Sequence, residues 1–217
     1  GWQWRIPLQH RIGNGHVFSS AHIDRTAATD LLLANLDGKP LADPNQIAFT
    51  AGHRARAWDK NVVALGLAAG FLEPLESTSI HLVQSGIARL LALFPDTGFS
   101  PVEIDRFNFE TTREYRNIRD FLVLHYRQSE RDDSEFWRYC KHMDVPDSLN
   151  HKRELFAASG RVGRDTDDLF RDASWVQVML GQGIIPADYD PMADVPAPAQ
   201  LAEFLANLKT LITRAVG

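Results

Sequence analysis

Cysteine, long apolar runs and blocks of like charge are all scarce in this chain of 217 residues. Cys140 is the only cysteine, which excludes an intrachain disulfide and a cysteine-based zinc site and favours a reducing, cytoplasmic compartment. No apolar stretch reaches the roughly 18 residues that a membrane-spanning helix needs. The 23 basic and 28 acidic residues are interspersed, with a net charge of −5, so we expect neither nucleic acid nor a membrane as a partner.

Motifs for metal binding, hydrolysis and dinucleotide binding are also missing. The eight histidines include no helix pair with a nearby carboxylate in a metal-binding pattern, so we expect no metal site. Ser77 lacks the Gly-x-Ser-x-Gly setting of a hydrolase nucleophile. Gly13-Asn14-Gly15 has neither the third glycine nor the following helix of the Rossmann fingerprint, and we predict a hairpin turn there.

The elements that the hydrophobic periodicity predicts change in kind along the chain, from strands to helices. The predicted strands cover residues 2–8, 16–19, 47–56 and 61–67, and the predicted helices cover 26–36, 77–94, 101–127, 134–143, 148–159, 168–180 and a final segment around 201–212. Residues 186–198, rich in proline and alanine, predict a loop. We therefore predict an α+β fragment, in which the end of a sheet domain, residues 1–95, precedes a mainly helical domain, residues 96–217.

Several features favour a chain cut from a longer protein. It starts at Gly1 with no initiator Met or signal peptide, and two tryptophans fall within the first four residues. The early strands form no complete sheet of their own, which suggests N-terminal partners. Helical spacing also predicts one buried apolar face on helix 77–94, made of Ile80, Val83, Ile87, Leu90, Leu91 and Phe94.

The turn before that helix has the composition of an anion-binding or cofactor-binding site. Small residues from Gly66 to Gly70 allow a ligand to approach the backbone, and Pro74 restricts the loop. Ser77 or Thr78 would cap the helix, whose first N–H groups and positive dipole end suit a flavin carbonyl, a phosphate or a halide. The simpler interpretation is a plain strand-to-helix connection with a capped helix.

Two motifs decide between these interpretations. Phe71-Leu72-Glu73-Pro74-Leu75-Glu76-Ser77-Thr78, together with the Trp-x-Trp-x-Ile-Pro pattern of Trp2, Trp4, Ile6 and Pro7, resembles the flavin-dependent halogenases, the tryptophan halogenase group. The resemblance continues through residues 119–126, 130–137 and 174–183. It implies that residues 1–95 end a flavin-binding α/β domain and that residues 96–217 form a helical substrate domain.

The resemblance also implies roles for single residues. Glu76 would be the catalytic glutamate, either positioning the halogenating species or accepting the ring proton, with Ser77 beside it. The backbone amides of Thr78 and Ser79 would hold the halide. Gly66, Ala69 and Pro74 would lie against the flavin, and the two tryptophans would be signature residues near it. Glu73 is predicted to be a structural or solvent-facing carboxylate.

For the whole protein, the resemblance implies halogenation of an electron-rich aromatic by reduced FAD from a separate flavin reductase, dioxygen, and chloride or bromide. Residues 167–177 lack the paired tyrosines of tryptophan-specific members, so indole is as good a substrate prediction as tryptophan. The family's glycine-rich motif and catalytic lysine match nothing here, so we expect this chain to be inactive without an N-terminal half, and the parent to be a homodimer. A flavin-dependent monooxygenase and a non-catalytic helical interaction module are the alternatives.

Overall fold

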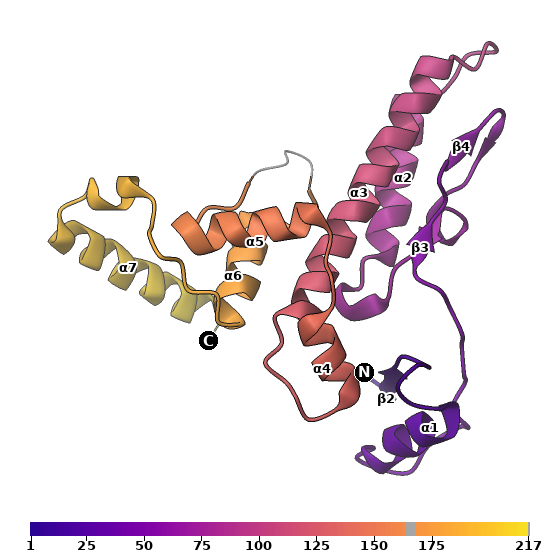
Figure 1. The fold of residues 1–217 in the computed structure, drawn as a ribbon, viewed down its shortest axis with the longest axis horizontal. Helices are drawn as coiled ribbons and strands as arrows, with labels where there is room; N and C mark the ends of the chain where they lie inside the picture. The colour runs from indigo at the N-terminus through magenta and orange to yellow at the C-terminus, as the bar shows by residue number, and fades with distance from the viewer. Residues whose placement is uncertain (164–167, 217) are drawn as a thin grey trace.

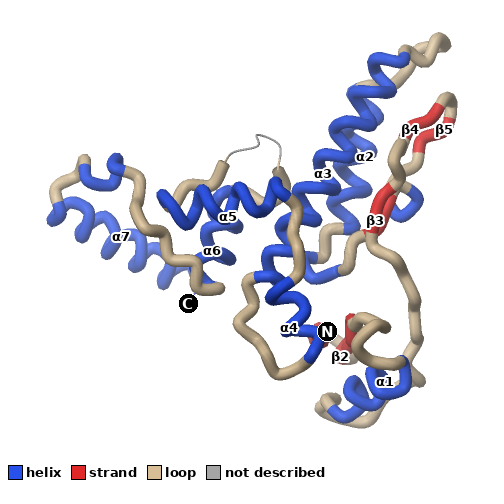
Figure 2. Tube along the Cα trace, in the orientation of Figure 1, coloured by secondary structure: helices blue, strands red, loops and turns tan. Residues whose placement is uncertain are grey.

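The structure is a computed structural model that describes residues 1–163 and 168–216. Its strands are β1 (Trp2–Pro7), β2 (Ile12–Val17), β3 (Gly52–His53), β4 (Trp58–Asp59), β5 (Val62–Val63) and β6 (Gly70–Phe71). Its α-helices are α1 (Arg25–Ala34), α2 (Ser79–Ala92), α3 (Pro101–Arg127), α4 (Glu135–His142), α5 (Asp147–Ser159), α6 (Asp172–Gly181) and α7 (Pro198–Val216). Short 3₁₀ helices are η1 (Gly66–Ala68), η2 (Pro74–Glu76) and η3 (Pro191–Asp194). The predicted α+β class is confirmed, with more helix than strand (Figures 1 and 2).

The predicted N-terminal hairpin is present, but its turn is not where the glycines indicated. β1 and β2 are antiparallel, and the chain reverses before β2, where the Leu8 N–H donates to the Arg11 carbonyl at 2.8 Å. Gly13 and Gly15 lie within β2 instead. A Cβ on Gly15 would come within 2.2 Å of the Trp4 indole, which lies across the paired strand. Gly15 is therefore needed for close packing against Trp4, and not for a turn.

The other strands are much shorter than predicted. Only Gly52–His53 of the predicted strand 47–56 pairs, with β6, and only Val62–Val63 of strand 61–67 pairs, with β4. The described residues form three separate two-stranded sheets. One reason is that Asn108 of α3 takes the place of a neighbouring strand, because its side-chain amide bonds the N–H and the carbonyl of buried Trp58, both at 2.8 Å.

Helix α3 organises the packing. The predicted segment 101–127 is a single helix, and α2 lies beside it (Figure 1). Phe107 packs with Trp58 in one buried cluster, Tyr115 with Leu72 in a second, and Phe121 with Trp175 in a third. The first two clusters join residues from both sides of position 95, so the two predicted parts of the chain share a core.

The predicted buried face of α2 is mostly exposed. Ile80 and Leu91 retain 74% and 68% of their accessible surface, while Leu82 and Gly86 are the residues buried against the rest of the chain. The polar side of α2, including Arg89, faces α3 and meets carboxylates there. The 3.6-residue period correctly found an apolar stripe, but the period alone could not say that α3 covers the opposite side.

The C-terminal helices follow the predictions more closely. The bounds of α4 and α5 agree with the predicted ones to within one residue. α6 begins at Asp172, later than predicted, and residues 164–167 lie outside the described part. The final amphipathic helix is confirmed as α7, although none of its residues is buried. No helix among the described residues is long and apolar enough to cross a membrane.

Candidate active site

The candidate site is the loop that joins β6 to α2. After Phe71 the chain passes Leu72, takes an extended conformation at Glu73 and then forms η2. Ser77 follows with φ 53° and ψ 38°, the left-handed conformation, and its side chain is exposed. This left-handed residue separates Glu76 from the start of α2, so the carboxylate and the helix N-terminus belong to one compact turn.

Within the described part of the chain, the Glu76 carboxylate lies against His125 near the end of α3. Its Oε1 lies 3.1 Å from His125 Nε2, and the two side chains are 33% and 17% exposed. His125 Nδ1 lies 2.8 Å from the Phe121 carbonyl one turn earlier. The imidazole also packs edge-on against the Phe121 ring, with centroids 4.9 Å apart. A histidine with both ring nitrogens engaged therefore anchors the Glu76 carboxylate.

The second carboxylate of the loop, Glu73, is tied to β1 and to α3. The Trp2 indole N–H donates both to Glu73 Oε2 at 3.2 Å and to the Tyr126 hydroxyl at 2.9 Å. Tyr126 and the Leu75 N–H also hydrogen-bond the Glu73 carboxylate. Glu73 is thus structural, as one of its two predicted roles had it, but not solvent-facing. Its Oε1 is buried, and no partner for it lies among the described residues.

Burial decides the electrostatics of this cluster. It raises the pKa of Glu73 above its usual range, and the nearby Glu76 adds to the rise, although the hydrogen bonds from Trp2, Tyr126 and Leu75 oppose it. Burial is also the main cause that raises the pKa of Tyr126, and the negative charge of Glu73 is the second cause. Tyr126 therefore stays a protonated donor to the carboxylate throughout the neutral pH range.

Glu73→Gln should change how stability depends on pH. The folded-state pKa of Glu73 is raised, so its contribution is complete below the unfolded pKa of about 4.5 and is lost as pH rises through the folded value. Glutamine has no charge to desolvate. We therefore expect the unfolding free energy of E73Q, relative to that of the wild type, to increase as the pH rises from 4.5 to 7. Urea denaturation at several pH values measures this difference. The exposed Glu203→Gln is the matched control, and a pH-independent difference for E73Q would contradict the assignment.

Thr78 and Ser79, whose backbone amides are predicted to hold the halide, form the start of α2. Thr78 is 3% exposed and occupies the N-cap position of α2, but its side chain makes no capping hydrogen bond. Among the described residues, neither the Thr78 N–H nor the Ser79 N–H donates a hydrogen bond to another group. Two adjacent backbone donors at a helix N-terminus fit a small anion or a carbonyl oxygen.

The small residues of the preceding turn serve the chain's own packing. Ala69 is 5% exposed and belongs to the cluster around Trp58. Gly66 is buried with φ 56°, and a Cβ there would lie 2.8 Å from Val83 of α2. Contacts of Gly66 and Ala69 with a flavin stay a prediction that their burial does not favour. Pro74, half-buried at the first position of η2, is the most accessible of the three residues predicted to contact the flavin.

The Trp-x-Trp-x-Ile-Pro residues differ in their position along β1. Trp2 joins the carboxylate cluster directly, whereas Trp4 lies over Gly15 within the hairpin. Ile6 and Pro7 are exposed at the far end of β1. The structure thus brings Trp2 to the candidate site and leaves the other three residues away from its hydrogen bonds.

Sequence reasoning missed His125 and Tyr126, which are the α3 partners of the two loop carboxylates. In the sequence, His125 is only one of eight histidines that form no metal-binding pattern. The available signal was the pair itself, two adjacent polar aromatic residues near the end of a helix, within a segment that resembles the halogenases. Periodicity could not show that both side chains point to one loop 50 residues earlier, because that contact depends on how α2 and α3 pack.

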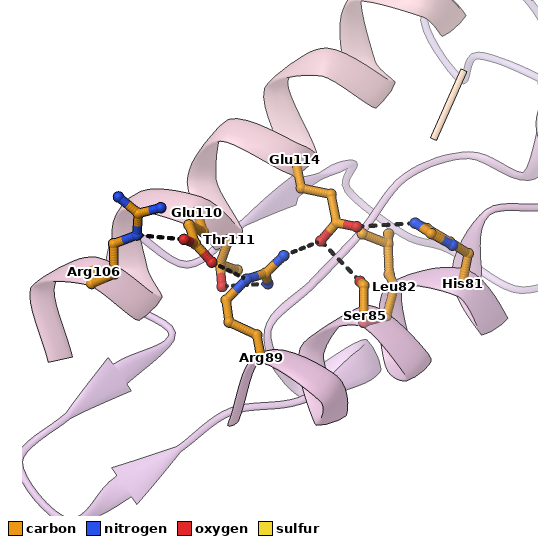
Figure 3. A network of polar contacts seen from close by, with 8 residues as sticks. All are labelled: His81, Leu82, Ser85, Arg89, Arg106, Glu110, Thr111 and Glu114. Carbon is orange, nitrogen blue, oxygen red and sulfur yellow. Dashed lines mark hydrogen bonds and ion pairs between the residues drawn. The ribbon is translucent and has the colours of Figure 1, made fainter. Parts of the chain in front are cut away.

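A polar cavity of about 610 Å³ lies between α2, α3 and the segment before α6. Arg89 of α2 crosses it to Glu110 at 3.3 Å and to Glu114 at 2.9 Å (Figure 3). Glu114 also accepts from Ser85 at 2.9 Å and lies 3.0 Å from His81. No group of three or more metal-ligating side chains converges in the described part of the chain.

Comparison with known proteins places this geometry in a family. The model of the tryptophan halogenase family matches residues 1–198. The chain belongs to that family. The tryptophan 7-halogenase KtzQ of Kutzneria sp. (strain 744) is 42% identical over 159 residues, which are 73% of this chain and 30% of that protein.

Solved structures of the family agree closely with the fold. Xcc4156, a flavin-dependent halogenase from Xanthomonas campestris, matches 99% of this chain with 50% identity and a TM-score of 0.93. BrvH, a flavin-dependent halogenase from Brevundimonas sp. BAL3, matches all of it with 48% identity and a TM-score of 0.92. These matches span 43% and 44% of the two solved chains, so this chain corresponds to less than half of either halogenase.

Proposed function

We propose that this chain supplies the catalytic glutamate and halide site of a flavin-dependent halogenase that acts on an electron-rich aromatic carbon. One observation carries the proposal. Glu76 is anchored by His125 at 3.1 Å in a loop that leads directly into two unbonded backbone amides, those of Thr78 and Ser79. Membership of the tryptophan halogenase family supports the same conclusion.

Two kinds of group in this chain would have separate roles: backbone amides would bind the halide anion, and a carboxylate would accept a proton. The Thr78 and Ser79 amides would hold chloride or bromide at the positive end of α2. A separate flavin reductase would deliver reduced FAD. Together with dioxygen and the halide, reduced FAD would supply the electrophilic halogen. After the halogen bonds to the ring carbon, that carbon must lose its proton, and the C–H electron pair restores aromaticity. Glu76 would accept this proton, with Ser77 beside it.

The substrate and the assembly are proposed from the same resemblance. Trp175 in α6 is 2% exposed, which gives this segment a role in core packing. Residues 168–177 offer no pair of tyrosines to hold an amino acid, so we favour indole or a similar ring over free tryptophan. We further propose that residues 1–95 complete the flavin-binding part, that 96–217 line the substrate region, that an N-terminal half completes the enzyme, and that the parent is a cytoplasmic homodimer.

The direct test uses the full-length protein with reduced FAD, dioxygen, bromide and indole, and analyses products by mass spectrometry. We expect monobromoindole that depends on both halide and reduced flavin. A hydroxylated product without halide dependence would identify a monooxygenase instead. Binding of indole without turnover, or no interaction at all, would count against the halogenase proposal and favour a non-catalytic module.

A further inference from the structure

The hydrogen-bond partner of His125 Nδ1 determines which ring nitrogen carries a proton. Nδ1 lies 2.8 Å from the Phe121 carbonyl, which can only accept a hydrogen bond, so Nδ1 carries a proton. Phe121 is 2% exposed and packs against Phe170 and Trp175. The orientation of the His125 ring is therefore set by the core of the helical part.

The other ring nitrogen, Nε2, faces the Glu76 carboxylate. With Nδ1 protonated, a neutral imidazole would present a lone pair at Nε2, 3.1 Å from the oxygen lone pairs of an ionised Glu76. A proton between Nε2 and Oε1 removes this repulsion and makes a charge-assisted hydrogen bond. Only the imidazolium–carboxylate form leaves Glu76 able to accept a further proton, at Oε2.

The surrounding charges point to the same assignment. Glu73 of the same loop is engaged with Trp2 and Tyr126, and its carboxylate lies close enough to Glu76 to raise its own pKa further. Among the described residues, His125 is the side chain within ion-pair distance of Glu76 that can carry a positive charge. His125 thus offsets the repulsion between two carboxylates on one short loop.

We propose that His125 is the positioning residue for Glu76, holding Oε1 through an Nε2–H donor so that Oε2 receives the proton of the halogenated ring carbon. This proposal rests on the halogenase function proposed above. The step conserves charge, because the ring proton forms an O–H bond on Glu76 while the C–H electron pair returns to the ring. His125 keeps both of its protons during this step.

Two substitutions separate this role from simple packing. His125→Phe keeps an aromatic ring against Phe121 but removes the donor, whereas His125→Gln keeps an N–H donor. In the full-length protein we expect H125F to lower kcat for indole bromination by about 10–100-fold, with KM and flavin affinity changed less than about threefold. H125Q should restore most of the kcat that H125F loses, because its amide still offers an N–H donor to Glu76. The exposed His142→Phe is the matched control.

A double-mutant cycle gives the sharpest result. In the Glu76→Gln background we expect H125F to cause no further loss of kcat, because the carboxylate that His125 positions is gone. Full additivity of the two losses, an unchanged kcat in H125F, or an H125Q as impaired as H125F would each overturn the proposal. Thermal unfolding of every variant shows whether a loss of kcat reflects a loss of fold.

A readout independent of turnover distinguishes the failure of this inference from the failure of the halogenase function. Side-chain ¹⁵N NMR of histidine in the wild-type protein should find both Nδ1 and Nε2 of His125 protonated under the assay conditions. A neutral Nδ1–H tautomer, which has no Nε2–H to donate to Glu76, would contradict the positioning role even in an active halogenase. If the protein halogenates nothing while NMR finds both nitrogens of His125 protonated, the proposed function fails and the Glu76–His125 pair stands.

Discussion

Glu76→Gln should lower kcat for halogenation by at least about 100-fold in the full-length protein, while flavin affinity stays within about twofold. The amide has the size of the carboxylate, and its oxygen can still accept the Nε2–H of His125, so the loop should keep its conformation. What is lost is the negative charge and the ability to accept a proton. Single-turnover product formation with reduced FAD and bromide measures the effect.

Deuterated indole then separates the two roles of Glu76. If Glu76 accepts the ring proton, its removal slows that step, and a primary deuterium isotope effect should appear in E76Q that is small in the wild type. If Glu76 instead positions the halogenating species, kcat falls with no isotope effect. Glu203→Gln on the exposed surface of α7 makes the same chemical change and should leave kcat unaltered. A kcat for E76Q within twofold of the wild type would refute the assignment.

Arg89→Met should cost about 3 kcal/mol of unfolding free energy, the largest stability effect that we expect of a polar substitution in this chain. The Arg89 guanidinium is 12% exposed and reaches Glu110, Thr111 and Glu114 of α3 (Figure 3). Methionine fills part of the same volume but leaves the 12%-exposed Glu114 carboxylate beside Ser85 and His81, neither of which is a permanent cation. An ion pair broken from one side leaves a poorly solvated charge, and that charge causes the loss.

Two further variants test this explanation. Arg106→Met removes a 59%-exposed arginine from the same Glu110, and surface pairs of this kind contribute at most about 1 kcal/mol. Adding Glu114→Gln to R89M should restore more than half of the stability, because it removes the stranded charge. Chemical denaturation curves measure all three variants. Equal losses for R89M and R106M, or no recovery in the double variant, would show that packing and not charge is responsible.

The helices could largely be predicted from the sequence, and the contacts between them could not. Proline at the start of α3 and the apolar period of α7 give bounds close to those observed. The strands fared worse, because side chains such as Asn108 take over the role of a neighbouring strand at Trp58. The side of α2 that faces α3 was also missed, since charged pairs cover it and apolar residues do not.

The candidate site shows the same division. The loop motif identified Glu76 and the helix start, because a strand, a proline and a capped helix follow one another within a few residues. His125 and Tyr126 escaped, because their pairing with Glu76 and Glu73 joins segments 49 and 53 residues apart, and no local pattern records it. The hydrogen bond that ties Glu73 to β1 was missed for the same reason, since its partner Trp2 lies 71 residues earlier in the sequence.

Helix α3 connects the three buried clusters of the chain, whereas the three small sheets are separate from one another. Its 27 residues rise about 40 Å, and Phe107, Tyr115 and Phe121 enter the three buried clusters in succession along that length. An amide in the middle of α3 can exchange its hydrogen only when the clusters on both sides have opened, which is the behaviour of a single cooperative unit. His125 lies near the end of the same rod, so the placement of the Glu76 carboxylate is coupled to the global stability of the fold.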